Sequence, residues 1–138
     1  MTKKDSYNIF PVGVMRKKDK SSFIEIFDEY GDGLLGLEKF SHIIILCWFH
    51  ENDTEENRNI LRVHPKRDKK KPLTGVFATR SPVRPNLIAL FTTKILAIKE
   101  NRIYIDNITA FNGSPVIDIK PYIPKEDSIR DVEVAEWL

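Results

Sequence analysis

Hydrophobic residues recur along the chain in short runs, and most of these runs have the length and composition of β-strands. The most apolar run covers residues 42–50, where three consecutive isoleucines favour a strand buried on both faces over a buried helix. The run at residues 116–119 carries Asp118 in its interior, and that carboxylate needs a partner if its face of the strand is buried. Strands are predicted at residues 9–15, 23–27, 42–50, 60–63, 76–79 and 116–119.

The clearest hairpin joins two β-type stretches, residues 87–98 and 102–108, through a polar turn at residues 99–101. Between the strands we expect turns, loops or short helical turns, at residues 16–20, 28–32, 34–40, 52–59 and 112–115. This inventory predicts a mainly β fold, in the form of a small antiparallel β-barrel or strongly curled sheet with little helix. At 138 residues the chain is expected to be one domain, spanning residues 1–138.

The distribution of charged residues indicates one candidate binding region. The chain has 22 basic and 20 acidic side chains and a net charge of +2, so nucleic-acid binding would require a local basic patch. Residues 66–71 carry five positive charges in six residues. A run of this kind is usually an exposed loop without a partner, but it is also the only dense basic cluster that could contact phosphates.

The remaining chemistry-bearing residues exclude several classes of site. A single cysteine, Cys47, rules out an intramolecular disulfide and suggests a reducing compartment. The three histidines and one cysteine form no zinc pattern, and the sequence has no GxGxxG, phosphate-binding P-loop or GxSxG motif. The start of the chain has no apolar signal region and the longest apolar run is too short to cross a bilayer, so we expect a cytoplasmic protein without metal.

The stretch GVFATRSPVRPNLIAL, residues 75–90, holds the best candidate for a binding loop. Pro82 and Pro85 fix their own φ angles and bias the preceding residues toward extended conformations, which predicts a stiff loop. Arg80 and Arg84 are the groups worth holding, because a guanidinium fits carboxylates and phosphates and also stacks on rings. The alternative interpretation is that the loop only caps a barrel end with surface ion pairs.

The same stretch resembles the signature of the TrmO family, also called TsaA-like. Three other stretches match this family in the same order, at residues 11–16, 36–50 and 112–122, and the resemblance covers residues 8–128. It implies a TsaA-like β-barrel and an S-adenosylmethionine-dependent methyltransferase, commonly a homodimer. The activity it implies is methylation of N6 of a threonylcarbamoylated adenosine next to the anticodon of tRNA.

The resemblance also implies a set of site residues, although no catalytic residue is assigned. The expected cofactor-binding residues are Phe49, His50, Arg80, Leu90, Asn112, Gly113 and Ser114. Arg80 could hold either the methionine carboxylate of the cofactor or a substrate phosphate, and the sequence leaves both roles open. Asn86 is expected to fix the loop itself. The candidates for contact with tRNA are Arg84, Lys69, Lys70 and Lys71.

Two other functions compete with tRNA methylation. One is a sensor or interaction module that binds S-adenosylmethionine without turnover, which is favoured by the short connection after Arg16, where the family has a longer loop. Polar or charged residues of the family pattern are also replaced at Val83 and Asn112. The other is a methyltransferase of small molecules, against which the basic run at residues 66–71 argues.

Overall fold

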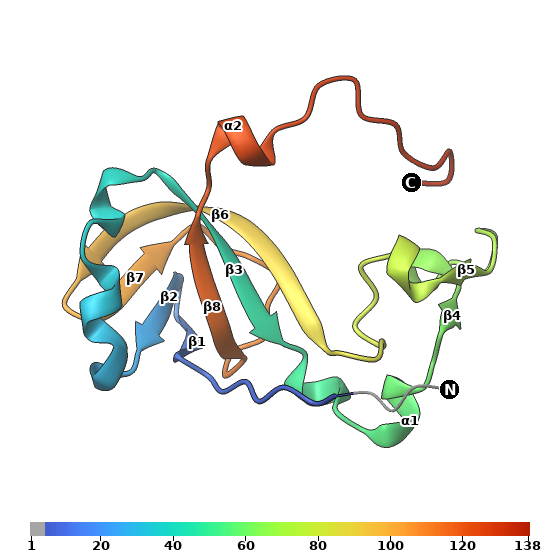
Figure 1. Ribbon diagram of the computed structural model, residues 1–138, viewed down its shortest axis with the longest axis horizontal. Helices are drawn as coiled ribbons and strands as arrows, with labels where there is room; N and C mark the ends of the chain where they lie inside the picture. The colour runs from blue at the N-terminus through green and yellow to red at the C-terminus, as the bar shows by residue number, and fades with distance from the viewer. Residues whose placement is uncertain (1–4) are drawn as a thin grey trace.

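Six β-strands close into an antiparallel barrel in the computed structural model, which describes residues 5–138 (Figure 1). Their order around the barrel is β1-β2-β7-β6-β3-β8, and pairing of β1 with β8 closes it. The strands are β1 (Gly13–Lys18), β2 (Ser21–Ile26), β3 (His42–Trp48), β6 (Ile88–Lys99), β7 (Arg102–Ile105) and β8 (Pro115–Pro121). The predicted mainly β barrel with short helical turns is confirmed, while residues 1–4 of the predicted domain span lie outside the described residues.

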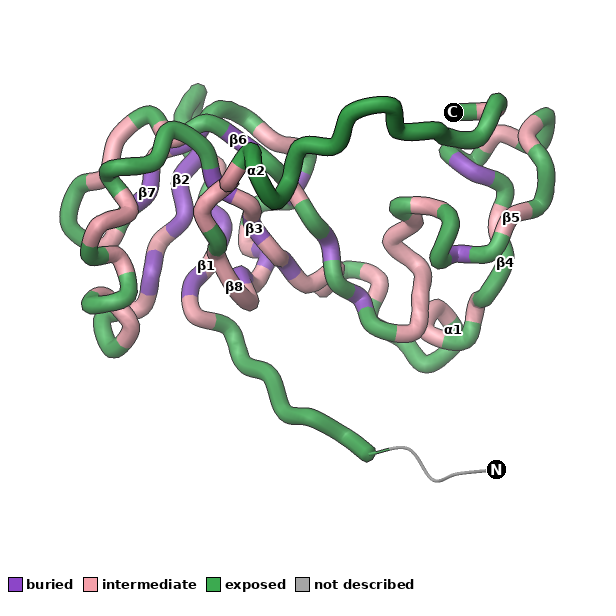
Figure 2. Tube along the Cα trace, turned by 45° about the horizontal axis from the view of Figure 1, so that its top comes forward, coloured by how far each residue is buried: buried purple, intermediate pink, exposed green. Residues whose placement is uncertain are grey.

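The core lies inside the barrel, where alternate residues of each strand meet (Figure 2). The strand β3 shows the pattern, since Ile43, Ile45 and Cys47 are buried while the residues between them are half-buried on the outer face. The prediction of a strand buried on both faces was therefore wrong. In a barrel closed by a single sheet, only one face of each strand points to the interior, even where the sequence is apolar throughout.

The first strand begins later than predicted and ends later. Residues Ile9 and Phe10 are exposed in an extended arm, and the strand runs from Gly13 through Lys18. Gly13 marks the start because an added Cβ would lie 2.5 Å from the carbonyl oxygen of Glu25, so only glycine lets the two strands approach here. Most of the predicted basic turn is therefore strand, and β1 and β2 are joined by a tight two-residue turn at residues 19–20.

The predicted hairpin of residues 87–98 and 102–108 is confirmed as β6 and β7, although β7 ends at Ile105. The carboxylate predicted to need a partner, Asp118, points to the outer face of β8. There its Oδ2 lies 2.8 Å from Nζ of Lys120, and this hydrogen bond and charge raise the pKa of Lys120. Two 3₁₀ helices cross one side of the barrel, η1 (Asp28–Leu34) and η2 (Leu37–Lys39), the first in place of a predicted turn.

Residues 49–86 leave the barrel between β3 and β6 and form a small lobe beside it (Figure 1). Its elements are η3 (His50–Asn52), α1 (Glu55–Arg58), β4 (Arg62–Val63), η4 (Pro65–Arg67), β5 (Thr74–Gly75) and η5 (Val76–Ala78). The predicted strand at residues 76–79 was wrong, because the two-residue strand β4 offers no further backbone to pair with. The chain instead turns at once, and the carbonyl of Val76 accepts hydrogen bonds from both N and Oγ1 of Thr79.

The C-terminal segment, residues 128–138, follows α2 (Pro124–Asp127) and crosses from the barrel back to the lobe (Figure 1). Nζ of Lys71 lies 5.8 Å from the ring centroid of Trp137, whereas Val132 and Val134 remain exposed. The C-terminal segment thus docks on the chain's own lobe, through Trp137. Within residues 5–138, the structure contains no helix long and apolar enough to span a membrane.

Candidate functional site

A cleft of about 710 Å³ opens where the barrel meets the lobe. Its walls come from the end of β3, the start of β6, the loop after η5 and the segment before β8. Its volume falls within the range of small-molecule sites. The cleft brings together most of the residues that the sequence singled out, namely Phe49, His50, Arg80, Arg84, Leu90 and Ser114.

Strand pairing places the aromatic side of this cleft. The strands β3 and β6 pair with Leu46 opposite Leu90, and the amide of Phe49 donates to the carbonyl of Leu87 at 2.8 Å. The pairing of β3 with β8 shifts register between Leu46 and Cys47, both of which line the cleft. A bulge at this position re-aims the side chains that follow it, as bulges next to binding sites commonly do.

The loop that carries Arg80 is held by its own side chains as well as by its prolines. Oγ1 of Thr79 accepts from the amide of Ser81 and Oγ of Ser81 accepts from the amide of Val83, each at 3.2 Å. Nη1 of Arg84 donates to the carbonyls of Thr79 and Ser81, both at 3.2 Å. These contacts agree with the predicted stiffness, and they leave Arg80 exposed at the cleft wall.

The far end of the loop is tied to α1. Nε of Arg58 donates to the carbonyl of Pro85 at 2.9 Å, and its Nη2 lies 3.5 Å from Oδ1 of Asn86. The contact with Asn86 agrees with its expected role of fixing the loop. Arg84 makes its backbone hydrogen bonds within the same loop, so its expected contact with tRNA stays a prediction.

The turn at residues 112–114 supports the cleft more than it lines it. Gly113 adopts a φ of 86°, and its amide donates to the carbonyl of Met15 at 2.7 Å. Oδ1 of Asn112 accepts from the amide of Lys17 at 2.8 Å, and Oγ of the buried Ser114 donates to the carbonyl of Phe111 at 2.7 Å. Of the three predicted residues, Ser114 reaches the cleft, and the other two hold the turn to β1.

Some cleft residues were missed by sequence reasoning. Phe91, Phe111 and Cys47 all line the cleft. Cys47 was used only to exclude an intramolecular disulfide and to suggest a reducing compartment. Phe111 precedes a predicted turn, and its position next to that turn was the available signal. Phe91 lies in the long strand β6, where the alternation of apolar and polar residues does not show which part of the strand faces the cleft.

The electrostatics of the cleft favour a ligand with an apolar or aromatic body and an anionic group. Its lining residues include three arginines, Arg67, Arg80 and Arg84, and no carboxylate side chain. Burial raises the pKa of the Cys47 thiol to about 11, so this sulfur stays protonated at neutral pH. Within residues 5–138, no group of three or more His, Cys, Asp or Glu side chains is arranged to hold a metal ion.

The basic run lies on the lobe, where Arg67 lines the cleft and Lys69, Lys70 and Lys71 do not. Lys69 and Lys70 are exposed and Lys71 is half-buried. The loop is shaped by its backbone, with Lys66 and Arg67 at φ of 55° and 58° and a hydrogen bond of 2.9 Å from the amide of Lys70 to Oδ1 of Asp68. The predicted phosphate contacts of Lys69, Lys70 and Lys71 therefore remain a prediction about the lobe surface.

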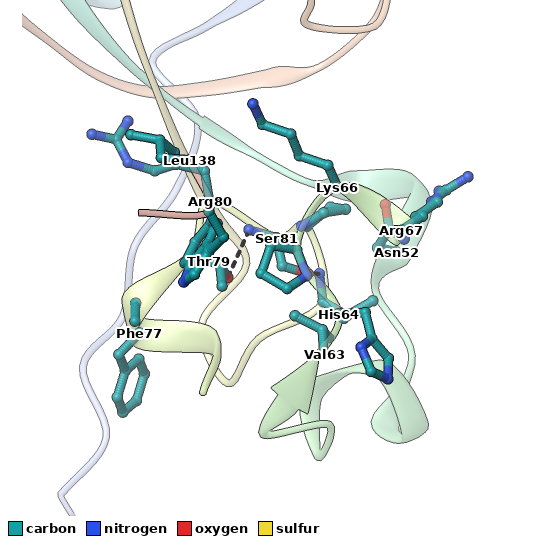
Figure 3. Close-up of a pocket in the computed structure, with 15 residues that line it drawn as sticks. Asn52, Val63, His64, Lys66, Arg67, Phe77, Thr79, Arg80, Ser81 and Leu138 are labelled. Atoms are coloured by element: carbon teal, nitrogen blue, oxygen red, sulfur yellow. Dashed lines mark hydrogen bonds between the residues drawn. The ribbon is translucent and has the colours of Figure 1, made fainter. Parts of the chain in front are cut away.

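A second cavity, of about 570 Å³, lies next to the cleft (Figure 3). Lys66 and Arg67 extend outward from its edge, and Ser81 and Thr79 form the hydrogen bond drawn in the figure. Trp137 and Leu138 of the C-terminal segment belong to its lining. The two cavities share Asn52, Arg67, Arg80 and Pro82.

A small closed barrel with a cationic, aromatic-lined cleft beside an Arg-Pro loop defines the class of protein, the TsaA-like β-barrels. The chain belongs to the family described as the tRNA-methyltransferase O N-terminal domain, whose model matches residues 4–128. The resemblance to the TrmO family is thereby confirmed.

Relatives and solved structures agree with this membership. A protein of Methanocaldococcus jannaschii called a probable S-adenosyl-L-methionine-binding protein is 50% identical over 121 residues, which cover 88% of this chain and 96% of that one. The human tRNA (adenine(37)-N6)-methyltransferase is 43% identical over 107 residues, 78% of this chain and 24% of the human protein. The crystal structure of TrmO from P. aeruginosa superimposes with a TM-score of 0.76 at 25% identity, over 99% of this chain and 64% of that chain.

Proposed function

We propose that this protein is an S-adenosylmethionine-dependent methyltransferase that modifies N6 of an adenosine in tRNA, a threonylcarbamoylated adenosine next to the anticodon. The observation that carries the proposal is the convergence of Phe49, His50, Arg80, Leu90 and Ser114 on one cleft. Family membership and the names of the relatives support the chemistry.

The cleft fits this cofactor in size and in its chemical groups. Rings at Phe49, His50 and Phe111 can face an adenine, and aromatic faces also attract a sulfonium cation. Arg80 offers a forked donor for the methionine carboxylate. Because no side-chain carboxylate lines the cleft, nothing there would repel that anionic end.

The reaction needs alignment more than a strong acid or base. When bound, the cofactor would supply an electrophilic methyl group to N6, which would release one proton to water while sulfur keeps the electron pair of its C–S bond. Holding the two reacting atoms in line can provide much of the rate. The loop around Arg80, fixed by Arg84 and Arg58, contributes that rigidity. The protonated thiol of Cys47 is a poor competitor for the methyl group.

The short connection after Arg16 adds no wall to this cleft. Residues 16–20 form the end of β1 and the turn to β2, and none of them lines the cleft. The alternative of a binding module without turnover therefore stays open, and it is an outcome of the test below.

Calorimetric titration with S-adenosylmethionine and with its demethylated product tests the cofactor site. Wild type should bind both saturably, and Arg80→Ala should weaken binding at least tenfold, because a charge-assisted bond to the carboxylate is lost. Arg62→Ala is the matched control, since Arg62 is an exposed arginine of β4 outside the cleft lining and should bind as wild type does. Binding without methyl transfer to tRNA would favour the sensor, and no binding would refute the proposal.

The basic run is tested by the salt dependence of tRNA binding. Replacing Lys69, Lys70 and Lys71 by glutamine should weaken binding and lower the slope of log K against log salt by roughly two to three units. Exposed lysines of the barrel provide the control triple, Lys18, Lys20 and Lys39. An unchanged slope in the first triple would favour a small-molecule methyltransferase. A homodimer and a cytoplasmic location complete the proposal, and light scattering of the purified protein tests the first of these.

A further inference from the structure

The second cavity combines aromatic rings with positive charge. Phe77 is 81% exposed, a high value for a phenylalanine, and Trp137 comes to the same cavity from the C-terminal segment. The basic lining side chains are Lys66, Arg67 and Arg80, and no side-chain carboxylate belongs to the lining. Exposed rings beside cations are the arrangement by which proteins bind unstacked nucleotides of a single strand.

The position of this cavity adds a second argument. It shares a wall with the cleft, made by Arg67, Arg80, Pro82 and Asn52. A methyl donor in one cavity and an acceptor in the other would meet at that wall. The hydrogen bonds of Thr79, Ser81 and Arg84 hold the loop that forms this wall, so the position of the wall is fixed by the structure of the loop.

The C-terminal segment closes one side of the cavity. Nζ of Lys71 lies over one face of the Trp137 ring, 5.8 Å from its centroid, and a ring has a second face on which a base can stack. Lys71 belongs to the basic run, so an RNA strand that follows this run would pass directly by the cavity. The ring and the charges thus fit one occupant, a single nucleotide of an RNA strand. The neighbouring nucleotides of that RNA would lie on residues 66–71.

We propose that this cavity is the acceptor site, in which one unstacked purine nucleotide of an RNA strand binds with its base against Trp137 and Phe77 and its phosphate at Lys66 and Arg67. The proposal rests on the proposed methyl transfer and assigns its acceptor a place separate from the cofactor. Trp137 and Phe77 are positioning residues, since they hold the base and take no part in bond making.

The site is tested with a protein whose only tryptophan is Trp137, obtained by the change Trp48→Phe. Its fluorescence is followed during titration with a single-stranded oligoadenylate of eight nucleotides, and a base stacked on the ring should quench it saturably. Circular dichroism and a calorimetric titration with S-adenosylmethionine on the same protein check that the fold and the cleft are unaltered.

Variants then separate the acceptor site from the cofactor site. Phe77→Ala and Trp137→Ala should each weaken oligonucleotide binding, or raise the KM for tRNA, about tenfold or more, with cofactor affinity unchanged. Trp137→Phe should restore most of the loss, because any ring can stack. Phe10→Ala, which removes an exposed ring lying 5.9 Å from Tyr30 on the η1 side of the barrel, is the control and should bind RNA as wild type does.

The outcomes distinguish the two proposals. Quenching of Trp137 without methyl transfer would support the nucleotide site and refute the proposed enzyme. Methyl transfer that survives Phe77→Ala and Trp137→Ala unchanged would overturn the acceptor site and leave the enzyme intact. Loss of cofactor binding in both variants would also overturn it, because the cavity would then belong to the cofactor.

Discussion

Cys47 offers a sharp test of the cleft's burial through the dependence of stability on pH. Its side chain is 1% exposed, and burial raises the pKa of its thiol from 9.0 to about 11. Below pH 9 the thiol is protonated in both the folded and the unfolded chain, so the stability is independent of it. Between pH 9 and pH 11 the unfolded chain releases the proton and the folded chain keeps it, which favours unfolding.

The size of the effect follows from the shift. Each unit of pKa difference corresponds to about 1.4 kcal/mol, so the loss reaches roughly 1.4 kcal/mol at pH 10 and approaches about 2.7 kcal/mol above pH 11. Other groups, lysines and tyrosines above all, titrate in the same window. The measurement must therefore be a difference between two proteins that share those groups.

The assay is guanidinium unfolding of wild type and Cys47→Ala at pH 8, 9 and 10. At pH 8 wild type should be the more stable, because alanine leaves a cavity beside Ile45 and its neighbours in the core cluster. The stability difference should shrink by about 1.4 kcal/mol between pH 8 and pH 10. A difference that stays constant with pH would refute the buried, protonated thiol and with it the argument that Cys47 does not compete for the methyl group.

Three further predictions concern the barrel and the loop. Gly13→Ala should destabilise the fold by roughly 1–3 kcal/mol, because the added Cβ would lie 2.5 Å from a backbone carbonyl of β2. Gly33→Ala is the control, since the space around its Cβ is open. Equal melting temperatures of the two variants would contradict the contact. Ile43→Ala in the core should lower the free energy of unfolding in urea by about 2–5 kcal/mol, and Ile44→Ala, at a half-buried position, should lower it clearly less. The order of the two variants would reverse if β3 faced the other way. Arg84→Ala should loosen the loop and so weaken cofactor binding in calorimetry. Arg84→Lys should not restore the affinity, because lysine lacks the planar fork of arginine. Full affinity in either variant would exclude this role of Arg84.

Sequence patterns predicted the strands of the barrel better than those of the lobe. The runs around Ile24, Ile43, Ile103 and Val116 are strands in the structure because each supplies alternate apolar residues to one shared interior. The run at residues 76–79 looks equally strand-like but is η5, because its neighbour β4 is only two residues long. A strand needs a partner, and local composition does not show whether one exists.

The sequence also predicted some residues of the candidate site better than others. Phe49, His50, Arg80, Leu90 and Ser114 were predicted from the family motifs, and they meet in one cleft. Asn112 and Gly113 were predicted with them but hold the turn to β1, a distinction that depends on which side of a turn faces the cavity. No sequence pattern showed that Trp137 would reach the cavity beside Arg80.

The sequence by itself therefore determined the family, the mainly β class, the stiff Arg-Pro loop and six of the residues that line the cleft. These features follow from motifs and from apolar runs, which act locally along the chain. The tertiary structure alone decided the closure of the barrel by β1 and β8, the single buried face of β3 and the return of residues 128–138 to the lobe. Each of these depends on contacts between segments far apart in sequence, whose free energy is gained only when the partner surface is already in place.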